Sequence, residues 1–486
     1  MDNLIYLTAG ELASAIQKRE VSSAEVVEAF LARIAACNPA LNALVTVDEV
    51  GAREAAARAD EALARGERPG PLHGVPVTFK DVFETAGLRT TAGHRPLAGN
   101  VPGQDATVVA RLRAAGAIVL GKTNLPELAM DTQCANALFG ITRNPWDPER
   151  TPGGSSGGEA AALAAGMTPL GVGSDLGGSV RIPAHFCGVF SLKPTEGRIP
   201  MTGHIPPLPG TMNWIRHLAV AGPMARSVAD LRLALTILAG PDGKDPSALP
   251  VPLAATPGRA LKDCRVAWTD DIGGLPVSAD TREALGRLAD GLAAAGCRVE
   301  RAHPPDFDWD AIWRTYGGLV GVLLAAQVPL PLRAVLRSLG GLIFRKDPVT
   351  RAGSRRVTAG MKSYFDLLEQ RDRWTRSLEG FLAGVDAWLL PVSSAPAFPH
   401  RKTGRINAPL EVDGVAIPGH LATLGMTCPF NLTGSPVVVL PMGRSRDGLP
   451  MGCQVVGRRW ADAALLDVAE AVSEVTGPFV PPPQPG

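Results

Sequence analysis

Short apolar runs alternate with helical patterns through much of the chain, and this alternation limits the possible folds most strongly. Apolar runs without polar alternation are typical of strands buried on both faces. The predicted strands are 75–79, 116–120, 169–173, 264–268, 297–302, 386–392 and 435–441. Helices are predicted between them, at 105–115, 158–166 and about 280–295. The pattern therefore predicts an α/β fold, with a large mixed, mostly buried β-sheet and helices on both faces.

The N-terminal segment is predicted to be helical throughout. Two capping-box pairs, Thr8 with Glu11 and Ser22 with Glu25, each begin a helical pattern. The second pattern is expected to stop near Asn38-Pro39, because proline interrupts the hydrogen-bond ladder of a helix.

Three regions are expected from these patterns. Residues 1–66 would be N-terminal helices packed on the core, 67–475 one large domain, and 476–486 a disordered Pro-rich tail. The irregular stretch 240–262 is interpreted as a surface excursion rather than a linker.

Composition excludes several classes of protein. Lys plus Arg is 48 and Asp plus Glu is 47, so charge gives no reason to expect a nucleic-acid partner. No run of 18 apolar residues and no signal-peptide pattern is found, so stable membrane insertion is not expected. The seven cysteines are scattered without C-x-x-C spacing. We therefore expect a reduced, cytoplasmic protein without a metal site.

Two short motifs resemble sites of other enzyme classes. Residues 116–123, GAIVLGKT, match a phosphate-loop pattern, but the four middle residues are apolar and predict a buried strand. Residues 153–157, GGSSG, match the nucleophile elbow of Ser-His-Asp hydrolases. That elbow requires a preceding apolar strand, whereas NPWDPERTP is loop-like. No histidine lies in a sequence context that suggests a catalytic partner for this elbow. The phosphate-loop and elbow interpretations are therefore both disfavoured.

The most informative region is 151–194, which contains two glycine-flanked serines, Ser155 and Ser179. Glycines allow the backbone to approach a substrate closely. The tight turn that ends at Ser179 can direct several N–H groups into one concavity, which suits an oxyanion. Lys80 ends a predicted buried strand upstream. One glycine-serine cluster alone would indicate only a turn, but two clusters and this lysine suggest catalysis.

At these residues the sequence strongly resembles the amidase signature family. The resemblance covers roughly residues 8 to 475 and is looser between 240 and 425. The looser matching implies a variable region that determines substrate choice at about 305–425. The blocks that carry it are LHGVPVTFKD (72–81), GKTNLPELAM (121–130), GGSSGGE (153–159), GSDLGGSVRIP (173–183), GPMARSVADL (222–231) and GLPMGCQVVG (448–457).

The resemblance implies a Ser–Ser–Lys triad. Ser179 matches the nucleophile, Lys80 the base, and Ser155 the serine preceded by a cis peptide bond. Lysine acts as a base only when neutral, so its pKa must be lowered by burial. Asp81 would oppose this, but the next residue of a strand should point to the opposite face. The N–H groups implied for the oxyanion hole are those of Leu176, Gly177, Gly178 and Ser179.

Neighbouring residues are assigned supporting and binding roles. Asp175, Arg181 and Ser156 are expected to hold the catalytic turn in place. The residues expected to line the substrate site are Ala129, Met130, Asp131 and Gly154. The apolar stretch 311–344 is either a helical lid over a hydrophobic acyl or aryl pocket, or plain core.

The function implied is hydrolysis of carbon–nitrogen amide bonds through an acyl-enzyme, with esters and carbamates as further small-molecule substrates. No cofactor is expected, and the protein would be a monomer or homodimer. Two alternatives remain: the glutamine-amidase subunit of a tRNA amidotransferase, and a non-catalytic interaction protein that retains the fold. A phosphate-loop NTPase is a remote third.

Overall fold

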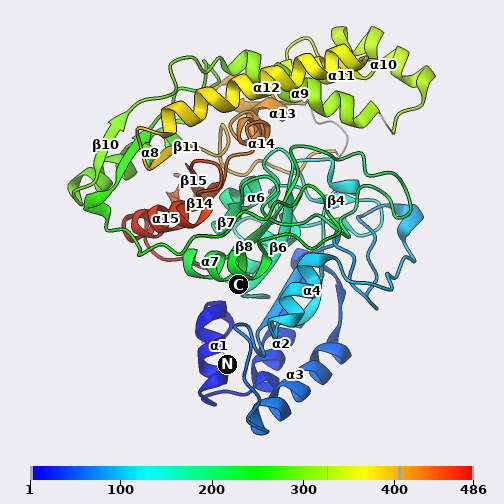
Figure 1. The fold of residues 1–486 in the computed structure, drawn as a ribbon, viewed down its shortest axis with the longest axis vertical. Helices are drawn as coiled ribbons and strands as arrows, with labels where there is room; N and C mark the ends of the chain where they lie inside the picture. Colours follow the sequence, from blue (N-terminus) through cyan, green and yellow to red (C-terminus); the bar gives the residue numbers. More distant parts are fainter. Residues whose placement is uncertain (1–3, 326, 403–407, 484–486) are drawn as a thin grey trace.

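A mixed sheet of 11 strands forms the centre of the molecule (Figure 1). The computed structural model describes residues 4–325, 327–402 and 408–483. Across the sheet the strands are β1 (Leu44–Val47), β3 (Ile118–Thr123), β2 (Pro76–Lys80), β6 (Leu170–Asp175), β8 (Val220–Ala225), β7 (Phe190–Lys193), β14 (Val437–Arg444), β15 (Pro450–Val456), β11 (Ala387–Pro391), β9 (Arg265–Trp268) and β10 (Arg298–Arg301). The predicted α/β architecture is confirmed.

The sheet separates two hydrophobic clusters. Along β14, Val437 and Val439 belong to one cluster, whereas Val438 and Leu440 belong to the other. Successive strand residues point to opposite faces, so the clusters lie on opposite sides of the sheet. The helices that cover these faces are α4 (Thr107–Ala114), α5 (Gly157–Ala164), α6 (Arg181–Cys187), α7 (Val228–Leu238), α8 (Ala279–Ala294), α14 (Cys428–Leu432) and α15 (Asp462–Thr476).

The N-terminal segment contains a strand as well as helices. Both predicted capping boxes are present, at the starts of α1 (Ala9–Gln17) and α2 (Ser23–Leu41). The prediction of an all-helical segment is wrong, because β1 pairs with β3 at the sheet edge before α3 (Glu49–Ala64) begins. The helix continues two residues beyond Pro39 and ends at Leu41, close to the predicted stop near Asn38-Pro39. Pro39 removes one N–H near the helix end, a loss that the last turn of α2 tolerates.

The stretch 240–262 has no helix or strand until a short 3₁₀ turn begins at Leu261. Strands that precede this stretch form one side of the sheet and strands that follow it form the other. The pairing of β7 with β14 joins the two sides.

The described part of the C-terminal tail contacts the N-terminal segment. The rings of Phe479 and Tyr6 are 6.2 Å apart. The prediction of a disordered tail is therefore wrong at Phe479, because an aromatic ring can bury apolar area even in a Pro-rich segment. Residues 484–486 lie outside the described residues.

A helical layer covers one end of the molecule, at the top of Figure 1. It consists of α9 (Trp309–Ala325), α10 (Leu330–Ile343), α11 (Pro348–Arg356) and α12 (Met361–Leu382). The small elements β12 (Pro409–Val412), β13 (Val415–Pro418) and α13 (Gly419–Leu424) follow, and β4 (Ala135–Asn136) pairs separately with β5 (Gly140–Ile141). Among the described residues, no helix is long and apolar enough to cross a membrane.

Candidate active site

Lys80 and Ser155 are in direct contact inside the fold. Lys80 is the last residue of β2, and its Nζ lies 2.6 Å from Ser155 Oγ and 3.1 Å from Ser174 Oγ. Because β2 and β6 are parallel neighbours, their carboxyl ends meet at the same edge of the sheet. The Gly154–Ser155 peptide bond is cis.

Ser179 lies in the turn between β6 and α6 and lines the same cavity as Ser155 and Ser174. The cavity has a volume of about 340 Å³. The two serine-rich segments are joined by their backbones, since the Ser156 N–H donates to Ser179 O at 3.1 Å. Ser156 Oγ also donates to Ser174 O at 3.3 Å. The structure therefore brings Lys80, Ser155 and Ser179 to one site.

Burial changes the protonation of Lys80. Its side chain is fully buried, and burial lowers the pKa of its ammonium to about 7, against the smaller opposing effect of Asp175. The adjacent Asp81 accepts hydrogen bonds from the N–H and hydroxyl of Thr91, at 3.0 and 2.6 Å, instead of contacting Lys80. The expectation that Asp81 faces away from Lys80 is confirmed.

Glu159 lies behind Lys80 and was not singled out from the sequence. Its carboxylate accepts hydrogen bonds from Thr78 Oγ1 and, at 2.9 Å, from Thr123 Oγ1. Thr78 shares the face of β2 with Lys80, and Thr123 is the β3 residue opposite Lys80. Burial raises the pKa of Glu159 to about 7. A second buried titratable group therefore lies near Lys80.

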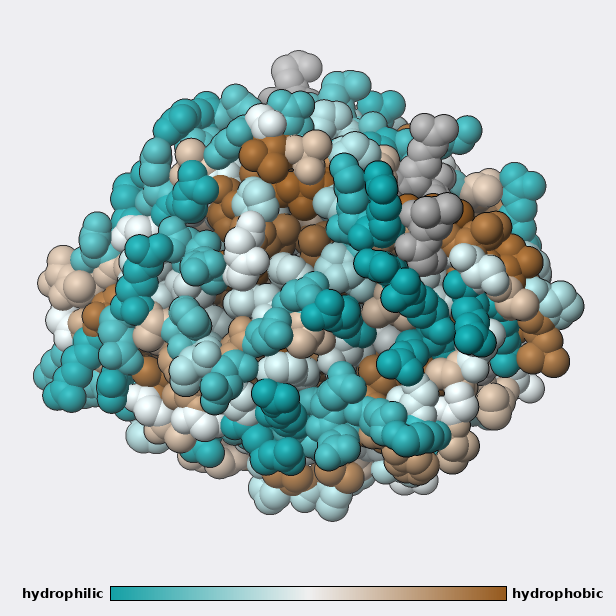
Figure 2. All heavy atoms as spheres, turned by 90° about the horizontal axis from the view of Figure 1, so that it is seen from above, coloured by the Kyte–Doolittle hydropathy of each residue, from teal (hydrophilic) through white to brown (hydrophobic). Residues whose placement is uncertain are grey.

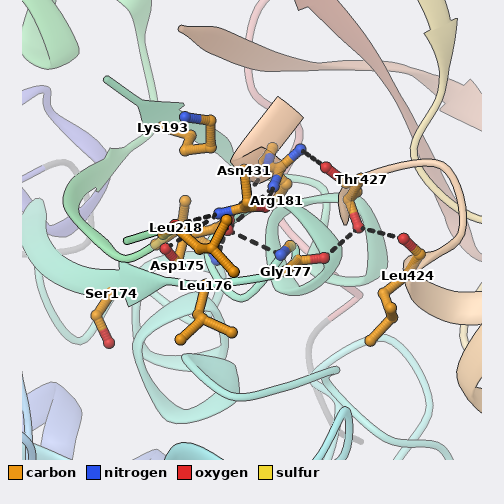
Figure 3. Close-up of polar contacts among 12 residues, drawn as sticks. Ser174, Asp175, Leu176, Gly177, Arg181, Lys193, Leu218, Leu424, Thr427 and Asn431 are labelled. Carbon is orange, nitrogen blue, oxygen red and sulfur yellow. Dashed lines mark hydrogen bonds and ion pairs between the residues drawn. The ribbon is translucent and has the colours of Figure 1, made fainter. Parts of the chain in front are cut away.

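Asp175 and Arg181 fix the turn that carries Ser179 (Figure 3). The two side chains form a fully buried ion pair, with Arg181 Nη2 3.0 Å from Asp175 Oδ1. Arg181 Nη1 donates to Thr427 O at 2.8 Å, and Asn431 Nδ2 donates to Asp175 Oδ1 at 2.9 Å. Burial opposes the charge on Asp175, but Arg181 and Asn431 outweigh it and hold its pKa below the usual range.

Three of the four N–H groups predicted for the oxyanion hole are available. In the described part of the chain, the N–H groups of Leu176, Gly177 and Ser179 have no protein acceptor, and all three residues line the cavity. The prediction is wrong for Gly178, whose N–H donates to Asp175 Oδ1 at 2.8 Å. Gly178 has a φ of +134°, and a Cβ there would lie 2.3 Å from Thr427 Oγ1, so only glycine fits.

The predicted substrate-binding residues are mostly placed at the cavity. Ala129, Met130 and Asp131 line it. Gly154 does not, because its α-carbon faces the backbone of residues 131–133, where a Cβ would lie 2.7 Å from Asp131 O. That prediction is therefore wrong.

The rest of the cavity wall is mainly apolar and comes from the helical layer. Gly317, Val320 and Leu324 of α9 and Leu336 of α10 line it. Further apolar lining residues are Ile182, Trp214, Ile215, Phe344, Val349 and Val357. The stretch 311–344 therefore contributes to the cavity wall, as the lid interpretation requires, although residue 326 lies outside the described chain.

His204 is a lining residue that sequence reasoning missed. Its Nδ1 is 2.9 Å from Pro206 O, which can only accept, so Nδ1 carries the proton. Its Nε2 is buried without a partner among the described residues, and burial lowers its pKa to about 4. His204 therefore contributes a neutral imidazole to the cavity lining.

Neither of the two disfavoured motifs forms its site. Lys122 of the phosphate-loop pattern is buried in β3, where its ammonium donates to Phe83 O and, at 3.0 Å, to both Thr85 Oγ1 and Thr90 Oγ1. The residues before GGSSG form no strand. Within the described residues, no group of three or more His, Cys, Asp or Glu side chains could hold a metal ion.

Comparisons with known proteins agree with this geometry. The family model described as Amidase matches residues 25–466. The chain is 36% identical to a glutamyl-tRNA(Gln) amidotransferase subunit from Chloroflexus aggregans, over 98% of each chain. It is also 36% identical to an acylamidase of Rhodococcus erythropolis, over 96% of this chain and 95% of the relative.

Solved structures share the fold. A bacterial aryl acylamidase of the amidase signature family superimposes with a TM-score of 0.79 and 27% identity, over 97% of this chain and 96% of that one. The chain belongs to the amidase signature family.

Proposed function

We propose that this protein hydrolyses amides that have an apolar acyl or aryl group, through an acyl-enzyme on Ser179. The observation that supports this most directly is the 2.6 Å contact between a buried lysine and Ser155, at a cavity that also contains Ser179. A lysine with a pKa of about 7 is substantially neutral near neutral pH and can accept a proton.

The proposed reaction begins with proton transfer. Ser155 passes the hydroxyl proton of Ser179 to Lys80 as Ser179 Oγ attacks the carbonyl carbon. The N–H groups of Leu176, Gly177 and Ser179 stabilise the oxyanion, a contribution typically worth about 3–4 kcal/mol per donor in related chemistry.

Collapse of the tetrahedral intermediate completes the acylation. The proton returns through Ser155 to the leaving nitrogen, because an unprotonated amide anion leaves poorly. Water then hydrolyses the acyl-enzyme by the same route. Esters and carbamates pass through equivalent tetrahedral intermediates and are proposed as further substrates.

The apolar lining of the cavity favours substrates that have an apolar acyl group. Val320 and Leu324 of α9 and Leu336 of α10 lie on one side of the cavity, and Trp214 and Ile215 also line it. Each buried methylene contributes about 0.8 kcal/mol to binding. Burying the charged α-amino and α-carboxyl groups of a free amino acid against such a wall would cost free energy.

A second candidate is the glutamine-amidase subunit of a tRNA amidotransferase. It is favoured by the 36% identity to a curated protein of that kind. The apolar cavity favours the free-standing enzyme. The purified chain should hydrolyse acyl p-nitroanilides without a partner or ATP and show little glutaminase activity; the converse result would support the amidotransferase role. The seven free cysteines are compatible with the cytoplasm in either case.

A fluorophosphonate probe tests the nucleophile. Wild-type protein should be labelled at Ser179 within the tryptic peptide 151–181, as located by tandem mass spectrometry. Ser179→Ala should lose labelling and reduce p-nitroanilide hydrolysis by about a thousandfold or more, with an unchanged unfolding temperature. Ser247→Ala, at an exposed serine, is the matched control. Labelling at another residue, or substantial activity in Ser179→Ala, would refute the proposal.

A further inference from the structure

A second cavity, of about 700 Å³, lies in the helical layer and is lined mainly by cations. Its cationic lining residues are Arg314, Arg345, Lys346, Arg351, Arg355 and Arg356. Among the described residues, the only acidic one that lines it is Asp310, which forms an ion pair with Arg314 one turn away on α9. We refer to this cavity as the basic groove. None of the serines of the active site lines it.

Most of these cations lack a counter-charge. Among the described residues, Arg345, Lys346, Arg351 and Arg355 take part in no ion pair, and Asp347 is paired with His420 instead, at 3.5 Å. Arg351 Nε is buried, and no hydrogen-bond partner for it is found in the described part of the chain. The whole chain has a net charge of only +1, so this concentration of positive charge is local.

The cations on and just before α11 have positions that are only partly favourable for the stability of this helix. Arg355 and Arg356 lie in its last turn, where cations interact well with the helix dipole. Arg345 and Lys346 precede its N-cap, Asp347, where positive charge is unfavourable. Arg351 and Arg355 are also one turn apart and repel each other. A bound anion would relieve both conflicts.

We propose that the basic groove binds the phosphate group of an anionic ligand. Guanidinium groups match phosphate oxygens with paired hydrogen bonds, which makes arginine the preferred residue for such sites. Three arginines of α11, Arg314 of α9 and the 345–346 pair surround one cavity, so several of them can contact the same di- or polyphosphate. The groove is separate from the cavity that Ser155 and Ser179 line, which we call the acyl cavity after the proposed function. The acyl cavity lies on the other side of α11, where Gly353, Ser354 and Val357 line it.

Two sources of phosphate are compatible with this chemistry. One is a soluble di- or polyphosphate, and the other is an anionic lipid headgroup. The second source is considered because neighbouring α10 exposes Leu330, Leu332, Val335, Leu339 and Ile343. Figure 2 views the molecule from the side of the helical layer and shows brown, hydrophobic side chains at the right-hand edge, where α10 lies in Figure 1.

Calorimetric titration of the full-length protein with inorganic pyrophosphate at low salt tests the site. One saturable site per chain is expected. The double variant Arg351→Gln/Arg355→Gln should weaken binding by at least about tenfold. The double variant Arg345→Gln/Lys346→Gln should have the same effect, and its two positions lie between α10 and α11, outside either helix. The control Arg68→Gln/Arg376→Gln removes two exposed positive charges elsewhere and should change affinity less than about twofold.

A sedimentation assay distinguishes the sources. The protein is mixed with vesicles of phosphatidylcholine that contain 30% phosphatidylglycerol. If it sediments with them and is released by pyrophosphate, the source of the phosphate group is a lipid headgroup. Pyrophosphate binding without sedimentation identifies a soluble ligand. Failure to bind either probe overturns the proposal. Equal loss of affinity in the control variant also overturns it, because the attraction would then be diffuse.

Discussion

At the scale of single residues, the proposed function depends on the protonation of Lys80. An exposed lysine has a pKa of about 10.4 and is almost entirely charged at neutral pH. Burial at the end of β2 lowers the pKa of Lys80 to about 7. Only neutral Lys80 accepts a proton, so kcat/KM should rise as the pH increases through about 7. The pH profile of the wild-type enzyme is therefore the reference for any change near this site.

Glu159→Gln should move that rise to lower pH. The negative charge of Glu159 stabilises protonated Lys80 and opposes the effect of burial. Glutamine can accept from one of the two threonine hydroxyls and donate its amide N–H to the other, but it has no charge, so the pKa of Lys80 falls further. The variant should be more active than wild type relative to its own maximum near pH 7, where a substantial fraction of Glu159 is ionised in the wild type. The measurement is kcat/KM for a p-nitroanilide between pH 5 and 9.

Glu54→Gln is the control for this prediction, because Glu54 is exposed on α3 and pairs only with Arg58 among the described residues. Its pH profile should match wild type. A shift of the Glu159→Gln profile to higher pH would mean that Glu159 lowers the pKa of Lys80, contrary to the electrostatic reasoning. An unchanged profile would show that Glu159 has no effect on the pKa of Lys80.

The sequence predicted the residues whose roles follow from a local pattern. Lys80, Ser155 and Ser179 were identified because their motifs are short and ordered along the chain. Glu159 was missed because its partner Thr78 is 81 positions away, so only the fold brings them together. The Gly178 N–H was misassigned because its acceptor, Asp175 Oδ1, depends on the side-chain rotamer. Sequence patterns do not specify such rotamers.

At the scale of elements, close packing of α9 against α11 shapes the acyl cavity. A Cβ at Gly321 would lie 2.2 Å from Gly353 O, and one at Gly317 would lie 2.1 Å from Val349 O. Gly317, Gly321 and Gly353 also line the cavity. The helices can therefore approach this closely only because glycines occupy these positions, and any side chain there must push the cavity wall outward.

Gly321→Ala should consequently destabilise the protein and alter the cavity. Overpacking of this kind costs about 1–3 kcal/mol. Displacement of α11 should also change KM for a long acyl p-nitroanilide more than for the acetyl compound. The matched control is Gly286→Ala on α8, where nothing lies within 4 Å of the new methyl group. That variant should gain about 0.5–1 kcal/mol from higher helix propensity.

Thermal unfolding and KM for acyl chains of two lengths measure both effects. Equal unfolding temperatures for Gly321→Ala and Gly286→Ala would show that α9 and α11 can move apart without a loss of stability. Equal changes in KM for short and long chains would show that α11 does not contact the acyl group. Either result would remove the structural basis for assigning acyl specificity to this pair of helices.

Elements were predictable where their periodicity is strong. The buried strands β2 and β3 read as continuous apolar runs, and the capping boxes of α1 and α2 identified their first turns. The edge strand β1 was missed because it has four residues, only one of them buried. Its strand conformation depends on pairing with β3, a contact that local sequence does not reveal.

At the scale of the whole molecule, residues before and after 240–262 form the two sides of one sheet. The β7–β14 ladder joins them, with Val437 opposite Lys193. Two ion pairs also cross this boundary: Arg198 with Asp462 at 3.1 Å, fully or almost fully buried, and Arg232 with Asp467 at 2.7 Å. We propose that residues 67–475 form one cooperative domain on this basis.

A cut in the connecting stretch should therefore leave the enzyme intact. A protease site inserted after Gly258, where a Cβ would meet nothing within 4 Å, should be cleaved without disturbing either side of the sheet. Denaturing electrophoresis should give two fragments, whereas size exclusion should give one peak of unchanged volume with most of the activity retained. The fragments stay together because separation would expose the unpaired edges of β7 and β14 and the apolar side chains packed between the two sides. It would also break the ion pair between Arg198 and Asp462. Fragments that separate without denaturant would show instead that the two sides are independent domains, each stable with an open sheet edge.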